Sequence, residues 1–200
     1  MAETYFDKIS SQIKTGNEPF RWYRNRIKEL GTPSVPELLR SGKLNNKPHP
    51  KHLNMFVYSP KGARKLPYYD TFPLVLPLER YSDGFLGMNF HYLPIPLRMK
   101  LLDRMFDFAG GDEENFDENT QVRVSYDDVK NINLVKPTIK RYLAGFTKSQ
   151  FRRIDADEFV VATLLPVQKF KKAKSSSDAS GKLDAQFMPV PYNLNIQLYA

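Results

Sequence analysis

Prolines and glycines break up the aromatic-rich stretch between residues 53 and 96, and this punctuation limits what the chain can fold into. Proline removes a backbone donor and glycine weakens a strand, so together they leave room for short strands and tight bends. The apolar runs between them predict strands at residues 53–58, 71–78 and 84–92, with a turn at 59–62. Such strands favour a small, bent antiparallel sheet or a partial barrel.

Helical periodicity flanks this stretch on both sides. Residues 18–30 predict an amphipathic helix with Asn17 as N-cap, Pro19 in its first turn and Gly31 at its end. Further helices are expected at residues 4–13 and 94–108, and from the capping box of Ser34 and Glu37 to Gly42. Another helix is expected from Pro137 onward, and its inward face would carry Ile139, Tyr142, Leu143 and Phe146.

Two later segments carry strand signals. Residues 121–126 alternate between apolar and polar side chains, and residues 159–165 form a β-branched, apolar run typical of a buried strand. A helical turn is the alternative for the second segment. With the helices, these strands indicate the α+β class.

Composition divides the chain into four parts. Residues 1–42 are expected to form an N-terminal helical arm, 43–52 a linker rich in lysine, asparagine and proline, and 53–174 the α+β core domain. Residues 175–200 are expected to form a flexible segment with a strand-like tail. The stretch 169–182, basic and then serine-rich, is typical of a mobile segment.

Several protein classes are disfavoured. The chain has no cysteine, which excludes disulfides, thiolate nucleophiles and cysteine-ligated zinc. Its apolar runs fall short of the roughly 18 residues that span a bilayer, and its first residues lack the basic-then-apolar order of a signal peptide. We therefore expect a soluble, intracellular protein without contact to a membrane.

Positive charge is concentrated in particular segments. The net charge is +8, and residues 129–154 carry seven basic side chains and no acidic one. Residues 112–128, in contrast, carry seven acidic side chains and one arginine. This asymmetry indicates either a polyanion or an acidic protein surface as the partner, although such a charge is also common in proteins that bind neither.

Basic residues next to aromatic ones suit a surface that neutralises phosphates and stacks bases. The alternative is that the aromatic rings point inward and the charges are solvated, which we favour for Tyr142 but not for Trp22, because Trp22 lies off the apolar helix face. The candidate nucleic-acid-binding residues are Arg21, Arg24, Lys28, Lys140, Arg141, Arg152 and Arg153.

Catalytic motifs are missing from the sequence. G-x-S-x-G, H-E-x-x-H and G-K-[ST] do not occur, so we expect no enzyme and no cofactor. His49 and His52 lack a third ligand at metal-binding spacing, and His91 is expected to be a structural residue rather than a base.

A metal-dependent nuclease is the strongest enzymatic alternative. Asp70, Glu79 and Asp83 flank predicted strands, and two-metal chemistry requires carboxylates that converge on shared ions. The sequence lacks the expected catalytic lysine after them, because Arg80 follows Glu79 directly.

Two runs of sequence carry a resemblance to a known family. They are LPYYDTFPLVLP at residues 66–77 and DGFLGMNFHYLP at residues 83–94. These runs resemble the signature of the DNA end protector (head completion) proteins of contractile-tailed phages. The resemblance implies a minor virion protein, made in the host cytoplasm, that binds double-stranded DNA ends and shields them from exonuclease, with no catalytic residues.

The C-terminal residues 188–200 are similar to a segment of the tail-sheath stabiliser (tail completion) proteins of the same phages. Residues 187–199 alternate like a strand that pairs with another protein, through Tyr192, Leu194, Ile196 and Leu198. This pattern favours contacts with other phage neck or tail proteins in a multi-subunit assembly. A neck or baseplate connector that touches only protein is therefore an alternative function.

Overall fold

The computed structural model describes residues 3–14, 18–40, 43–109, 121–122 and 124–172. Its α-helices are α1 (Tyr5–Ser10), α2 (Phe20–Leu30), α3 (Val35–Arg40), α4 (Ile95–Ala109), α5 (Tyr126–Val129) and α6 (Phe159–Leu164). Its strands are β1 (Leu44–Asn45), β2 (Leu53–Met55), β3 (Tyr68–Asp70), β4 (Leu74–Tyr81), β5 (Gly84–Asn89), β6 (Ile139–Leu143), β7 (Phe151–Ile154) and β8 (Phe170–Lys172). Its 3-10 turns are η1 (Ala63–Lys65), η2 (Phe90–Tyr92), η4 (Lys136–Thr138), η5 (Ala144–Phe146) and η6 (Ala156–Glu158).

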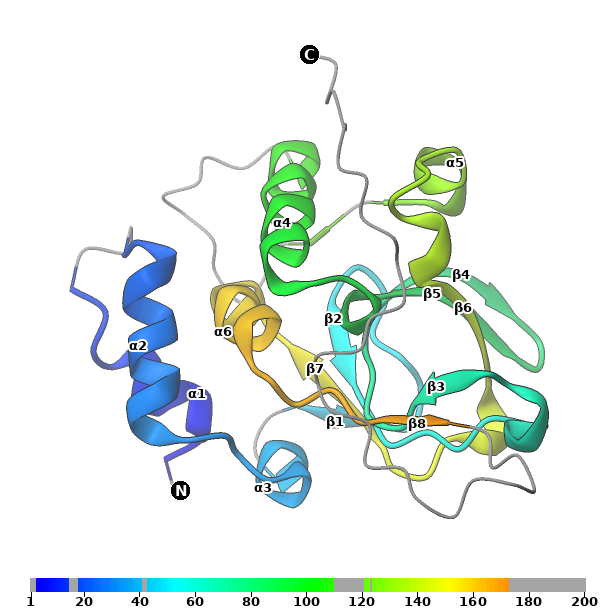
Figure 1. Ribbon diagram of the computed structural model, residues 1–200, viewed down its shortest axis with the longest axis horizontal. Helices are drawn as coiled ribbons and strands as arrows, with labels where there is room; N and C mark the ends of the chain where they lie inside the picture. The colour runs from blue at the N-terminus through cyan, green and yellow to red at the C-terminus, as the bar shows by residue number, and fades with distance from the viewer. Residues whose placement is uncertain (1–2, 15–17, 41–42, 110–120, 123, 173–200) are drawn as a thin grey trace.

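Six strands form an open antiparallel sheet in the order β1-β7-β2-β4-β5-β6, and β3 pairs with β8 in a separate ladder (Figure 1). The β4–β5 pairing shifts its register between Pro77 and Glu79, a bulge that bends the sheet where proline cannot donate a hydrogen bond. The predicted α+β class, with a bent antiparallel sheet and packed helices, is confirmed.

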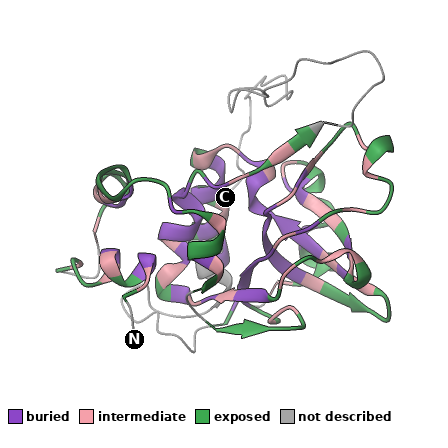
Figure 2. Ribbon diagram, turned by 90° about the horizontal axis from the view of Figure 1, so that it is seen from below, coloured by how far each residue is buried: buried purple, intermediate pink, exposed green. Residues whose placement is uncertain are grey.

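Alternation along the strands separates two apolar faces of the sheet. On β4, Leu74 and Leu76 belong to the larger cluster, while Val75 between them belongs to the smaller one. Buried residues concentrate in the sheet and in the helices that face it (Figure 2). The larger cluster gathers residues from α1, α2, α4 and α6, whereas the smaller one is mainly aromatic.

The aromatic face contains Phe56, Tyr58, Phe85, Tyr142 and Phe151, whose rings pack edge-on or stacked. Tyr142 is buried as expected, although it lies on strand β6 and not on the apolar face of the predicted helix.

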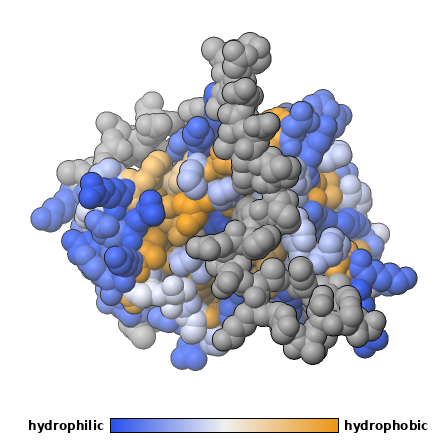
Figure 3. Space-filling view, in the orientation of Figure 1, coloured by the Kyte–Doolittle hydropathy of each residue, from blue (hydrophilic) through white to orange (hydrophobic). Residues whose placement is uncertain are grey.

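On the helical face, α6 packs against both α2 and α4. Figure 3 shows an apolar area over α6, between these two helices, while the outer side of α2 is hydrophilic. Among the described helices, none is long and apolar enough to cross a membrane.

The helix predicted from Pro137 onward is wrong. Pro137 lies in the 3-10 turn η4, and Ile139–Leu143 form strand β6, paired with β5 from Gly84 to Met88. Helical spacing had placed Ile139, Tyr142 and Leu143 on one face. The strand instead buries Tyr142 on the aromatic face and exposes Arg141 on the other.

The strand expected at residues 159–165 is also wrong, and the helical alternative is correct. Asp155 and Glu158 form a capping box that starts η6, from which α6 continues. The helix reads as uniformly apolar because it is enclosed by the sheet and two helices. Likewise, residues 124–125 are not in a strand, and Ser125 caps α5 through Asp128.

Some boundaries differ from those predicted. The N-cap of α2 is Pro19, without a side-chain bond. Strands β2 and β5 begin at Leu53 and Gly84 as predicted but end earlier, at Met55 and Asn89, and the strand predicted at 71–78 runs from Leu74 to Tyr81. Strand β7 was missed, and residues 170–172 of the segment expected to be mobile form β8. The box of Ser34 and Glu37 is confirmed. The division at residues 42, 52 and 174 stays a prediction.

Candidate nucleic-acid interface

The β3–β8 ladder is held in place by a buried carboxylate, Asp70. Its Oδ1 accepts hydrogen bonds from the backbone of Phe72 (3.0 Å) and Lys169 (3.1 Å), and its Oδ2 lies 2.7 Å from Nδ1 of His91. Asn89 also donates to Oδ2 at 3.3 Å. Asp70 therefore fastens β3, β5, η2 and the start of β8 to one another.

Asp70 and His91 lie in contact, but only Asp70 carries a charge. Burial would raise the pKa of Asp70, but His91 and the backbone donors bring that pKa below its usual range. Burial lowers the pKa of His91, against the opposing effect of Asp70. The pair is therefore a carboxylate that accepts from a neutral imidazole, a structural role that agrees with the expectation for His91.

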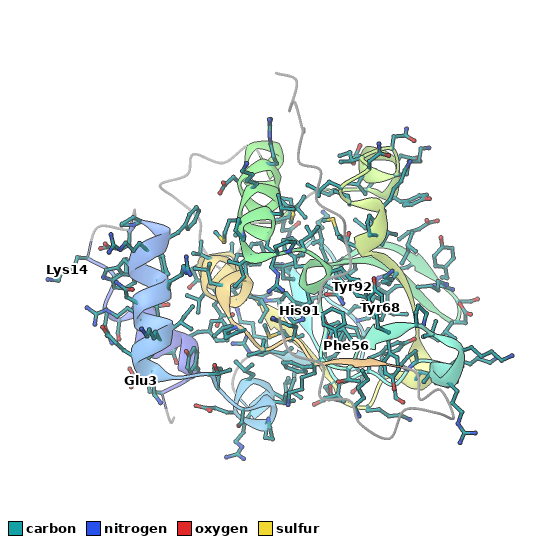
Figure 4. The ribbon with its side chains drawn as sticks, in the orientation of Figure 1. Glu3, Lys14, Phe56, Tyr68, His91 and Tyr92 are labelled. Atoms are coloured by element: carbon teal, nitrogen blue, oxygen red, sulfur yellow. The ribbon has the colours of Figure 1, made fainter. Side chains whose placement is uncertain are left out.

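Above this anchor lies a cluster of aromatic rings. The centroid of the Tyr92 ring is 5.7 Å from that of Tyr68 and 5.1 Å from that of Phe170, and Figure 4 shows Tyr68 and Tyr92 side by side. Nζ of Lys140, on β6, lies 4.4 Å from the Tyr92 ring centroid. Burial lowers the pKa of Lys140, and no described carboxylate pairs with it. The cluster thus joins exposed aromatic surface to a half-buried cation.

Three segments that meet around this cluster contain no acidic residue. Residues 58–69, 139–148 and 165–171 are joined by the β3–β8 ladder and by the bridge between Tyr58 and Thr147. Their basic residues are Lys61, Arg64, Lys65, Lys140, Arg141, Lys148, Lys169 and Lys171. All but the half-buried Lys140 are exposed.

We name as the β3–β8 basic surface the residues Arg64, Lys65, Lys140, Lys169 and Lys171. Within the described part of the chain, none of the five forms an ion pair with a carboxylate. The nearest acid in sequence, Asp70, is buried beneath the surface and bound to His91. The surface is therefore electropositive without internal compensation.

The basic stripe of α2 forms a second, separate group. Arg21, Arg24 and Lys28 are all exposed on the outer side of the helix, which is hydrophilic in Figure 3. Trp22, expected off the apolar face, is partly buried against the core and lies beneath Arg26. Helix α2 lies at one end of the molecule and β3 toward the other (Figure 1). The predicted residues therefore do not form one patch.

The remaining candidates are engaged with acids. Arg141 pairs with Asp83 and lies over the Tyr81 ring, 3.9 Å from Cζ to the centroid. Arg153 pairs with Asp155. Their positive charges are largely neutralised, in contrast to those of the β3–β8 basic surface.

Arg152 lies inside the protein, 1% exposed. It donates to both carboxylate oxygens of Glu158, at 2.9 and 3.2 Å, and its Cζ lies 4.3 Å from the Phe6 ring centroid. Strand alternation explains the placement, because Arg152 and Ile154 face the helices while Phe151 faces the aromatic cluster. Arg152 is therefore not presented to a ligand.

The carboxylates of the nuclease alternative do not gather. Asp70 is buried against His91, whereas Glu79 accepts from the Tyr81 hydroxyl and Asp83 pairs with Arg141 at the surface. Within the described residues there is no group of three or more histidine or acidic side chains that could hold a metal ion. His49 and His52 lie near Arg153, and burial lowers the pKa of both.

Sequence reasoning missed most of the β3–β8 basic surface. Arg64 and Lys65 lie between the predicted turn at 59–62 and the strand predicted from residue 71, and Lys169 and Lys171 lie in the segment predicted to be mobile. The available signal was the absence of acids from residues 58–69 and 165–171. The predicted partner residues Tyr192, Leu194, Ile196 and Leu198 lie outside the described residues.

An open α+β domain whose described basic residues form a surface without acidic partners, beside the partly exposed ring of Tyr68, has the features of a nucleic-acid-binding protein. A model of the family described as the Phage T4 terminal DNA protecting protein matches residues 7–185. The chain belongs to this family of bacteriophage proteins that protect DNA termini, which confirms the resemblance. No curated protein and no solved structure matches significantly.

Proposed function

We propose that this protein binds the ends of packaged double-stranded DNA through its β3–β8 basic surface and shields them from exonucleases. We further propose that it acts as a minor structural protein of the virion, in the head completion or head–tail neck region of a contractile-tailed phage. Family membership supports protection of DNA termini. The location within the particle rests on the resemblance to head completion proteins.

The observation that carries the proposal is the set of basic side chains that lack acidic partners. A solvated lysine or arginine paired with a carboxylate gains little from a phosphate, because it must first give up that partner. Arg64, Lys65 and Lys171 have no such partner among the described residues. Each phosphate that they neutralise releases condensed counterions, which favours binding.

The stripe of Arg21, Arg24 and Lys28 on α2 is assigned a secondary role. Its separation from β3 along the molecule suits contact with phosphates further from the DNA end (Figure 1). Arg141 and Arg153, paired with Asp83 and Asp155, are assigned no primary contact.

The C-terminal residues Tyr192, Leu194, Ile196 and Leu198 keep their proposed role in binding a neighbouring neck or tail protein by strand addition. A truncation before Phe187 should therefore reduce incorporation into particles without reducing DNA binding. A truncated protein that assembles normally would remove this part of the proposal.

The test compares binding to blunt linear duplex and to covalently closed circular duplex, at low and moderate salt, with Mg²⁺ present and cleavage monitored. Protection of the linear form from an added exonuclease is measured in parallel. We expect salt-sensitive preference for linear DNA, protection of its ends and no cleavage by the protein itself. Equal binding to both forms would contradict end recognition, and binding to neither would favour the protein-only connector.

A pair of charge-matched variants tests the surface. Arg64→Glu/Lys65→Glu reverses two charges on the β3–β8 basic surface, and Lys100→Glu/Arg104→Glu reverses two exposed charges on α4. We expect the first variant to lose at least tenfold in affinity and to leave DNA ends open to exonuclease. The second should bind within a few-fold of wild type. Equal losses in both variants would indicate a general effect of net charge and would overturn the assignment.

A further inference from the structure

The side chains of Tyr68, Tyr92, Phe170 and Lys140 form a cluster that is separate from the hydrophobic core. It draws on β3, η2, β8 and β6, and it lies outside both hydrophobic clusters that stabilise the sheet. Tyr68 is its outer member, 36% exposed. A partly accessible aromatic ring beside basic side chains is an arrangement suited to stacking on a base.

Lys140 is half-buried and has no anionic partner among the described residues. Its ammonium lies over the Tyr92 ring, 4.4 Å from the centroid, and the ring quadrupole compensates its charge in part. No carboxylate among the described residues pairs with it, and the neighbouring Asp70 is bound to His91. An anion of the size of a phosphate would complete its coordination.

The rings beside Lys140 offer a stacking surface. The rings of Tyr68 and Tyr92 are tilted by 34° to each other, with their centroids 5.7 Å apart. Lys140 and Tyr68 both contact Tyr92, and a single nucleotide is large enough to meet the ammonium with its phosphate and the Tyr68 ring with its base.

Duplex geometry determines which nucleotide can be reached. Inside a duplex both faces of each base pair are covered by neighbouring pairs, and removing a base from the stack costs a few kcal/mol. The last pair of a linear duplex has one face uncovered. A stacking platform beside a phosphate-binding lysine therefore selects ends over internal sites without reading the sequence.

We propose that Tyr68 stacks on the base of the terminal nucleotide of a DNA end while Lys140 binds its phosphate, with Tyr92 and Phe170 holding both groups in place. The proposal rests on the proposed function and deepens it, because it assigns end recognition to this platform and general duplex affinity to Arg64, Lys65, Lys169 and Lys171. Tyr69, the next residue on β3, and its partner Lys171 lie on the face of the ladder opposite Tyr68 and Phe170, so neither has a part in the platform.

The experiment uses the full chain and a blunt linear duplex that carries 2-aminopurine as its terminal base, with a second duplex labelled at an internal position. The fluorescence of this base falls when it stacks on an aromatic ring. We expect wild-type protein to quench the terminal label and to leave the internal label unchanged. Tyr68→Leu should abolish the quenching and weaken binding to linear DNA by about 5- to 100-fold, the range expected for one stacked base.

Matched variants keep the test independent of folding. Tyr69→Leu changes the adjacent residue and should quench as wild type does, and Tyr68→Phe should retain quenching. Lys140→Gln should weaken binding to linear DNA more when the terminal nucleotide carries a 5′-phosphate than when it carries a hydroxyl. A Tyr68→Leu variant that still quenches the terminal label would overturn the proposal.

The outcomes separate this inference from the proposed function. Salt-sensitive binding of linear duplex by wild-type protein, without terminal quenching, would overturn the platform and leave DNA binding by the basic surface standing. Absence of binding to any duplex would overturn the proposed function itself.

Discussion

Nη2 of Arg152 lies 2.9 Å from Oε1 of Glu158 inside the protein, beneath helix α1. Removing Arg152 would leave the partly buried Glu158 carboxylate without its cationic partner, with only the hydrogen bond from the Asp155 N–H among the described residues, and breaking a buried pair in this way costs up to about 3–5 kcal/mol. We expect Arg152→Ala to lower the free energy of unfolding by about this amount, measured by urea denaturation. Under conditions in which Arg152→Ala is folded, it should bind DNA with the same affinity as the wild-type protein.

A double variant provides the control for this pair. Arg152→Met/Glu158→Gln removes both charges and keeps a side-chain oxygen for the Asp155 N–H of the capping box, and removing both charges of a buried ion pair is often close to neutral. We expect it to recover most of the stability lost in Arg152→Ala. A double variant as unstable as the single one would show that packing on Phe6, rather than the ion pair, dominates.

Stability should decrease as the solution becomes mildly acidic. Burial lowers the pKa of His49, His52 and His91 below its ordinary value of 6.5. The unfolded chain therefore takes up protons near pH 6.5 that the folded protein does not, so stability is present above that pH and is lost as pH falls through it. Each histidine contributes up to about 1.4 kcal/mol per pH unit.

Protonation of two carboxylates changes the stability of the protein at lower pH. Asp70, whose pKa is lowered, adds to the loss of stability below about pH 4. Burial raises the pKa of Glu158 above its ordinary 4.5, so its protonation opposes the loss just above that value. Urea unfolding followed by Trp22 fluorescence should give a lower midpoint at pH 5.5 than at pH 7.5. A midpoint that rises would refute this account, and His49→Gln/His52→Gln should reduce the pH dependence.

Gly84 allows β5 and β6 to approach closely. A Cβ atom added there would lie 2.0 Å from the backbone oxygen of Tyr142, which cannot move without separating the strands. We expect Gly84→Ala to lower the unfolding free energy by roughly 1–3 kcal/mol. Gly145→Ala is the control, because no atom lies within 4 Å of its added Cβ, and the two midpoints should differ clearly in thermal unfolding.

Salt dependence distinguishes the two basic groups in DNA binding. The logarithm of the binding constant falls with the logarithm of salt concentration by about 0.9 for each phosphate contact. Arg64→Gln/Lys65→Gln/Lys171→Gln should reduce this slope by about two to three. Arg21→Gln/Arg24→Gln/Lys28→Gln should reduce it by less on short duplexes, and more as the duplex lengthens. A larger effect of the α2 variant on short duplexes would reverse the assignment.

The sequence by itself determined the family, the α+β class and most of the helices. The Pro- and Gly-punctuated runs around Tyr68 and Phe85 identified both the central strands and the relationship to phage DNA-protecting proteins. Local chemistry was sufficient in these places, because caps such as Ser34 with Glu37 are made by neighbours in the chain.

Tertiary structure alone decided the elements and residues whose partners are distant in sequence. Residues 139–143 carry apolar side chains at helical spacing, and pairing with β5 selected the strand against that local pattern. Enclosure by two helices made residues 159–164 helical although they are β-branched and apolar. From the sequence, Arg152 is expected to be a surface cation, but in the structure it is buried against Glu158 and Phe6. The β3–β8 basic surface likewise forms only where three segments distant in sequence meet. The positions of charged residues in the sequence do not determine whether their side chains are exposed or buried, because tertiary packing decides which way each side chain points.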